Sequence, residues 1–161
     1  MAQPPMDHRY CLLEESDFQP KEGYINIGYF GSFYARRNES DLFRLLKNEK
    51  VFLHVFTYKT FVSITEQAPE YADRVKVYPL VPYLQMLNVC SKMDYLLVSD
   101  MVFPYEINPF LPSKLADYRT AQVPVLALVH GNSPLSRLEL PDLIKVGEDD
   151  DSIIATLKKR S

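Results

Sequence analysis

Two short segments of the chain combine residue types that bind phosphate groups. The first holds, in chain order, Gly31, Ser32, Arg36 and Arg37. The second begins with Ser113 and Lys114. A glycine lets the backbone approach a ligand closely, and guanidinium and ammonium groups pair with phosphate oxygens. If both segments lie at the same edge of a sheet, the chemistry that they favour is the binding of a diphosphate.

A carboxylate, Asp117, follows Lys114 by one helical turn. Residues three apart on a helix share a face, so Asp117 is expected to lie beside the phosphate-binding residues. In dinucleotide-binding folds a carboxylate in such a place accepts the ribose hydroxyls. The sequence has no G-x-G-x-x-G fingerprint, which disfavours NAD. These residues therefore predict a site for a nucleoside diphosphate.

The elements that must position these residues are short apolar runs alternating with helical segments. The expected strands are 24–30, 51–56, 75–78, 95–98, 123–128 and 143–146. The expected helices are 41–48, 58–68, 83–90, 114–119 and 151–159, with a short helical piece after Gly131. This alternation predicts an α/β, Rossmann-like, doubly wound parallel sheet of about six strands with helices on both faces. In such a sheet the two segments meet at the carboxyl edge.

Residues 1–22 are polar and contain three prolines. They are interpreted as an N-terminal arm or interdomain linker, with Arg9 to Leu13 as a candidate short edge strand. Residues 23–161 then form the nucleotide-binding domain. No element begins cleanly before Tyr24, so the chain is expected to be one domain of a longer protein.

Composition and charge disfavour a nucleic-acid partner and a membrane-spanning segment. The 161 residues are 47 % hydrophobic and carry a net charge of −3, which fits one soluble domain and disfavours a nucleic-acid partner. No apolar run approaches the ~20 residues that span a membrane, and the N-terminus has no apolar signal region. Cys11 and Cys90 lack metal-binding spacing, so a reducing, cytoplasmic location is the simplest interpretation, with a disulfide between the two cysteines as the alternative.

Several polar residues have simpler roles. His54 and His130 lie near strand ends and are expected to be packing or loop histidines. Asp149 to Asp151 are expected to form an acidic helix start rather than a metal site. Neither a metal nor a cofactor is expected. For Lys114 and Asp117 the alternative is that they are solvated surface residues, and the same alternative holds for one of the two arginines.

The motifs resemble a known family. PSKLADY at 112–118 and PVLA at 124–127, supported by YFGSFY at 29–34, are similar to the C-terminal, donor-binding domain of GT-B glycosyltransferases. The likeness is greatest to the bacterial family-4-like group (glycosyl transferases group 1) that builds surface polysaccharides. It extends over residues 24–158.

The resemblance implies a role for each matching residue. Lys114 and Arg37 would hold the donor diphosphate and stabilise it as it leaves, and Asp117 would bind the ribose. The rest of the nucleotide site would be Gly31, Ser32, Arg36, Tyr78, Val81 and Ser113. Many retaining members have a glutamate at the place of Pro109, so the sugar contacts are expected from Asn108, Phe110 and Leu111 instead.

The expected function is that of a metal-independent hexosyltransferase, with a nucleotide sugar as donor and a glycan or glycolipid as acceptor. An N-terminal domain of the same protein would bind the acceptor, and this domain alone would turn over little. The full-length protein would be cytoplasmic or peripheral at the inner face of the membrane. The alternative is a non-catalytic glycosyltransferase-like module for protein interaction. A receiver-type regulator is disfavoured because Gly, Ser and Arg, rather than acids, follow the first strand.

Overall fold

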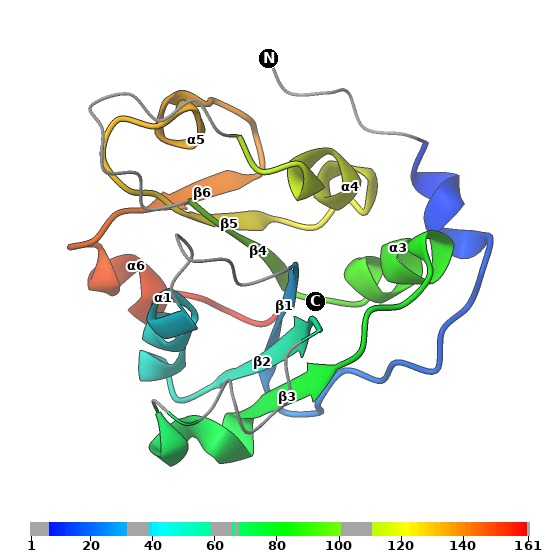
Figure 1. Cartoon of the computed structure of the whole chain (residues 1–161), viewed down its shortest axis with the longest axis horizontal. Coiled ribbons are helices and arrows are strands. Elements are labelled where there is room, and N and C mark those ends of the chain that lie inside the picture. The colour runs from blue at the N-terminus through cyan, green and yellow to red at the C-terminus, as the bar shows by residue number, and fades with distance from the viewer. Residues whose placement is uncertain (1–6, 32–38, 59–65, 67, 101–110, 161) are drawn as a thin grey trace.

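The six expected strands form one parallel sheet. The computed structural model describes residues 7–31, 39–58, 66, 68–100 and 111–160. The strands are β1 (Ile25–Phe30), β2 (Val51–Phe56), β3 (Val75–Tyr78), β4 (Tyr95–Ser99), β5 (Val125–Leu128) and β6 (Leu143–Val146). Their order in the sheet is β3-β2-β1-β4-β5-β6 (Figure 1). The chain therefore winds outward in both directions from β1 and β4, and the predicted doubly wound fold is confirmed.

The core lies on both faces of the sheet. Every residue of β1 and β2 is buried, as expected for central parallel strands covered by helices on both sides. Alternate residues feed two separate apolar clusters. One contains Ile27 and Leu53, and the other contains Phe56 and Leu96.

Each face has its own set of helices. On the face of Ile27 lie α1 (Glu39–Phe43), the 3₁₀ helices η2 (Arg44–Lys47) and η3 (Pro69–Arg74), and α6 (Asp151–Ala155). On the other face lie η1 (His8–Leu12), α3 (Tyr83–Ser91), α4 (Lys114–Thr120) and α5 (Pro134–Arg137). The helices expected at 83–90 and 114–119 are confirmed. The helix expected at 41–48 is split between α1 and η2, and most of the one expected at 58–68 lies outside the described residues.

The last helix is shorter than expected, because α6 ends at Ala155 instead of Lys159. Beyond it, the Lys159 Nζ atom donates to the carbonyl oxygen of Tyr24 at 2.9 Å, and the backbone N–H of Arg160 donates to Asp94 Oδ1 at 2.8 Å. These bonds tie the C-terminal segment to the amino ends of β1 and β4.

The edge strand expected at Arg9 to Leu13 is wrong, because this segment is the 3₁₀ helix η1. Asp7 accepts a hydrogen bond from the Arg9 backbone N–H at its start, and Cys11 is fully buried in the core beside α3 and α4. The Asn88 side chain donates to the Cys11 carbonyl oxygen at 3.0 Å. Contacts to α3, rather than sheet pairing, therefore hold this segment (Figure 1).

Candidate functional site

A pocket of about 160 Å³ lies at the point where the direction of chain winding reverses. β1 and β4 are neighbours there, and in open α/β sheets ligands bind at the carboxyl ends of such strands. The pocket is lined by Tyr29, Phe30, Gly31, Leu97, Val98, Ser99, Pro112, Ser113, Lys114 and Tyr118. The fold thus brings Gly31 to Ser113 and Lys114, as the alternation of strands and helices indicates. We call this the switch-point pocket.

One wall of the switch-point pocket is fixed by Tyr118. Its ring is fully buried, and its hydroxyl oxygen accepts a hydrogen bond of 3.2 Å from the backbone N–H of Phe30. This bond joins α4 to the last residue of β1. The Phe30 ring in turn stacks on Phe56, with 4.5 Å between ring centroids. Sequence reasoning missed Tyr118, although an aromatic residue on the sheet-facing side of a short helix is a usable signal.

Tyr118→Phe is expected to lower the free energy of unfolding by about 1–2 kcal/mol, because the buried N–H of Phe30 loses its acceptor while the ring stays in place. Urea unfolding measures this loss. Tyr10→Phe is the matched control, because in the described part of the chain the Tyr10 hydroxyl makes no hydrogen bond and its residue is 43 % exposed. Equal stability of Tyr118→Phe and the wild type would show that this bond does not hold α4.

Lys114 and Asp117 lie on one face of α4, as expected, and a residue of α3 joins them. Asp117 Oδ2 lies 4.0 Å from Lys114 Nζ, and Asp117 Oδ1 accepts a hydrogen bond of 2.6 Å from the Tyr83 hydroxyl. Lys114 Nζ also lies 3.5 Å from Met86 Sδ. Burial and the neighbouring Asp117 raise the pKa of Tyr83, so its hydroxyl stays protonated as a donor. The sequence alone does not indicate the bond from Tyr83 to Asp117.

Tyr78 uses its side chain inside the protein. Its ring stacks on Phe56 at 4.4 Å between centroids, and its hydroxyl lies 2.9 Å from His54 Nδ1. Burial raises the pKa of Tyr78 to about 12. Its carbonyl oxygen accepts from the Thr57 N–H, and Val81 packs on the same core. The membership of Tyr78 and Val81 in the nucleotide site stays a prediction.

The remaining predicted residues divide into two groups. Leu111 is half-buried against the core of the α3 face. The others lie outside the described residues: Ser32, Arg36, Arg37, Asn108 and Phe110.

Solved glycosyltransferases share this arrangement of strands and helices. WaaG is a glycosyltransferase involved in lipopolysaccharide biosynthesis. The structural match covers 84 % of this chain and 37 % of the WaaG chain, with 15 % sequence identity and a TM-score of 0.59. HepE of Anabaena, solved in complex with UDP and glucose, matches 94 % of this chain over 45 % of its own, with 11 % identity and a TM-score of 0.58. A glycosyltransferase from Rickettsia africae matches 95 % over 44 %, with 9 % identity and a TM-score of 0.59.

The fold is that of a GT-B glycosyltransferase domain. The family resemblance of the sequence is therefore confirmed as a likeness of fold. The chain spans less than half the length of these three solved structures. No protein-family model and no curated protein sequence matches it.

His54 is a packing histidine in this GT-B fold, as expected. It is 1 % exposed, and its Nε2 atom lies 2.7 Å from Asn26 Oδ1. The ring of Phe18 meets it edge-on at 4.9 Å. Burial and the charge of Lys76 lower the pKa of His54 to about 3, so it is neutral at pH 7.

His130 joins two segments at the carboxyl edge of the GT-B fold. Its Nε2 atom lies 2.9 Å from Asp41 Oδ2, and its Nδ1 atom lies 2.8 Å from Glu148 Oε1. The hydrogen bond to Asp41, and then the one to Glu148, raise the pKa of His130 to about 9. The protonated imidazole therefore links α1 to the loop before α6. It is an ion-paired residue rather than a simple loop histidine.

The acidic run 149–151 lies at the start of α6, but the side chain of its N-cap residue Asp150 does not cap the first turn of the helix. Asp150 Oδ2 accepts from the Gly147 N–H at 2.8 Å, and Asp151 pairs with Arg44 and Lys47 at 3.2 and 2.9 Å. Among the residues that the structure describes, no cluster of three His, Cys, Asp or Glu side chains is placed to hold a metal. Over the same residues, no helix is long and apolar enough to cross a membrane.

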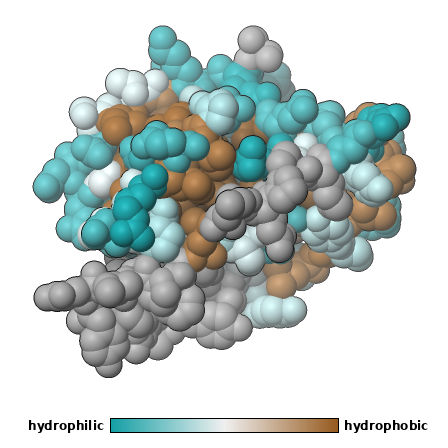
Figure 2. Space-filling model, turned by 90° about the horizontal axis from the view of Figure 1, so that it is seen from above, coloured by the Kyte–Doolittle hydropathy of each residue, from teal (hydrophilic) through white to brown (hydrophobic). Residues whose placement is uncertain are grey.

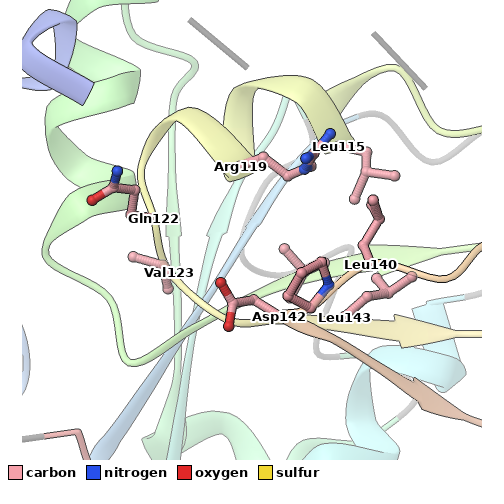
Figure 3. Close-up of a pocket in the computed structure, with 9 residues that line it drawn as sticks. Leu115, Arg119, Gln122, Val123, Leu140, Asp142 and Leu143 are labelled. Carbon is pink, nitrogen blue, oxygen red and sulfur yellow. The ribbon is translucent and has the colours of Figure 1, made fainter. Parts of the chain in front are cut away.

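A second pocket, of about 140 Å³, lies at the amino ends of β5 and β6 (Figure 3). Apolar side chains such as Leu115, Leu140 and Leu143 line it, with Arg119 of α4 on one side and Asp142 on the other. The view from above shows an apolar area bordered by polar residues (Figure 2). Because it lies at the amino ends of β5 and β6, this pocket is away from the predicted nucleotide site.

Proposed function

We propose that this chain is the donor-binding domain of a glycosyltransferase and binds a nucleotide-diphosphate sugar at the switch-point pocket. The observation that carries the proposal is the meeting of Gly31, Ser113 and Lys114 at the carboxyl ends of β1 and β4. The GT-B fold supports it, and so does HepE, a neighbour of the same fold that was solved with UDP and glucose.

The chemistry is electrostatic. In transfer, the bond between the sugar and the diphosphate oxygen breaks, and negative charge develops on the diphosphate. Lys114 and Arg37 offset that charge, so no metal is required. Asp117 accepts the ribose hydroxyls, and Asn108, Phe110 and Leu111 contact the hexosyl group.

A second domain completes the enzyme. It binds a glycan or glycolipid acceptor and supplies the base that takes the proton of the acceptor hydroxyl. This division accords with the matched share of the solved structures, which is under half. The domain by itself binds donor and turns over little. We place the protein in the cytoplasm or at the inner face of the membrane, in accord with Cys11 and Cys90 being free thiols.

Calorimetric titration with UDP, GDP and dTDP sugars tests the proposal. One of these nucleotide sugars is expected to bind. Asp117→Asn is expected to lower the affinity for that nucleotide sugar, and for the free nucleoside, by about tenfold, because a charged hydrogen-bond acceptor is lost. Inorganic pyrophosphate should bind the variant and the wild type equally. If none of the nucleotide sugars binds the wild type, the donor-binding function is contradicted. If Asp117→Asn weakens only the contribution of the sugar, the ribose assignment is wrong.

A further inference from the structure

Tyr83 has no assigned role, although it contacts the predicted site directly. It begins α3, its residue is 45 % exposed, and its hydroxyl donates to Asp117 Oδ1 at 2.6 Å. A short bond between a neutral donor and a carboxylate is among the stronger hydrogen bonds in proteins. Because Tyr83 is partly exposed, water could replace Asp117 as the partner of its hydroxyl. The bond therefore matters chiefly for the position of the Asp117 carboxylate.

The carboxylate that Tyr83 contacts lies near the ammonium group of Lys114, but not at hydrogen-bond distance from it. Lys114 Nζ and Asp117 Oδ2 are 4.0 Å apart, which is the outer limit of an ion pair, and their side chains are 37 % and 18 % exposed. Residues three apart on a helix can approach to hydrogen-bond distance. The Tyr83 hydroxyl draws the carboxylate toward α3, which limits its approach to Lys114.

The other neighbour of Lys114 leaves its charge available. Met86 Sδ, also on α3, lies 3.5 Å from Lys114 Nζ. A thioether is a weak acceptor and carries no charge, so it orients the ammonium group without neutralising it. Two residues of α3 therefore hold the cation and the carboxylate of α4 in separate places.

We propose that Tyr83 is a positioning residue that keeps Lys114 and Asp117 apart, so that the first can bind diphosphate and the second can bind ribose. The proposal rests on the proposed function for the identity of the ligand. Without the Tyr83 hydroxyl, the two side chains would form a tight pair with each other. Affinity for phosphate and affinity for ribose would then fall together, although the hydroxyl of Tyr83 bonds only to Asp117 within the described residues.

Tyr83→Phe, titrated calorimetrically with inorganic pyrophosphate and with UDP, tests this coupling. Pyrophosphate affinity is expected to fall about fivefold, and UDP affinity to fall further, because two contacts weaken. Adding Asp117→Asn to Tyr83→Phe should restore pyrophosphate affinity to the wild-type value, because a neutral amide cannot neutralise Lys114. UDP affinity should remain low. A role of Tyr83 in ring packing alone would not produce this restoration.

Tyr10→Phe is the matched control, since that tyrosine is 43 % exposed and is expected to leave both affinities unchanged. Wild-type affinity in Tyr83→Phe, or a loss that Asp117→Asn does not restore, would overturn the proposal.

A ligand-free crystal structure of Tyr83→Phe separates this proposal from the proposed function. The distance from Lys114 Nζ to Asp117 Oδ2 should shorten from 4.0 Å to about 3 Å. A distance that stays at 4.0 Å or lengthens would overturn the positioning role, whatever the chain binds. Absence of UDP-sugar, GDP-sugar and dTDP-sugar binding to the wild type, with a shortened distance in the variant, would contradict the nucleotide-sugar function and support the positioning role.

Discussion

Lys114→Ala is expected to weaken the binding of UDP and of inorganic pyrophosphate by about 1.5–3 kcal/mol, which is a loss of roughly 10- to 150-fold. Lys114 lines the switch-point pocket at the start of α4, and its amine is held by a neutral thioether and a carboxylate at 4.0 Å. Within the described residues Lys114 has no counter-ion nearer than Asp117 at 4.0 Å, so it can give most of its charge to a phosphate oxygen. Calorimetric titration of each ligand at fixed ionic strength measures the loss.

Lys158→Ala is the control for the loss of one positive charge. Lys158 is exposed near the C-terminus, and its side chain makes no ion pair within the described residues. A general effect of net charge would weaken both variants equally. Wild-type affinity in Lys114→Ala would mean that the diphosphate lies elsewhere, and an equal loss in the two variants would remove the specific role of Lys114.

The stability of the protein is expected to fall between pH 6.5 and 9.5 through His130. Its side chain is 14 % exposed and its pKa is raised to about 9 by the hydrogen bonds to Asp41 and Glu148. A group whose pKa is higher in the folded state contributes stability that is complete below its unfolded pKa of about 6.5 and is lost as the pH rises through the folded pKa. Because Glu148 is exposed, solvent screening reduces this contribution to about 2 kcal/mol.

Urea unfolding at pH 6.5 and pH 9.5, in the wild type and in His130→Gln, isolates this contribution. The wild type should lose about 2 kcal/mol more than the variant over that range, since other titrating groups cancel in the difference. Asp41→Asn should remove most of the same dependence, because Asp41 is the main cause of the raised pKa. Parallel loss in the wild type and His130→Gln would show that the ion pair does not stabilise the fold.

The strands could be predicted because each is a short apolar run between residues that interrupt regular structure. Val51–Phe56 and Leu143–Val146 have the expected bounds. The segment from Arg9 to Leu13 is too short to show a period, and its conformation is set by the Asp7 cap and by the burial of Cys11 against α3 and α4. Those contacts are tertiary, so no local pattern indicates them.

The same division applies to the candidate site. The meeting of Gly31 with Ser113 and Lys114 follows from the order of strands in a doubly wound sheet, which the alternation of elements predicts. The bond from Tyr83 to Asp117 depends on how α3 packs against α4, and the bond from Phe30 to Tyr118 depends on how α4 packs against β1. Both join residues far apart in the sequence, so they became visible only with the three-dimensional structure.

Backbone amide NMR of the ¹⁵N-labelled chain, during titration with UDP, GDP and dTDP sugars, tests whether a nucleotide sugar binds at the switch-point pocket. The largest chemical-shift changes are expected at Gly31, Ser113 and Lys114, with a further change at Asp117 when the ligand contains ribose. Shifts confined to the second pocket, around Arg119 and Leu143, or no shifts with any of these ligands, would contradict binding at the switch-point pocket.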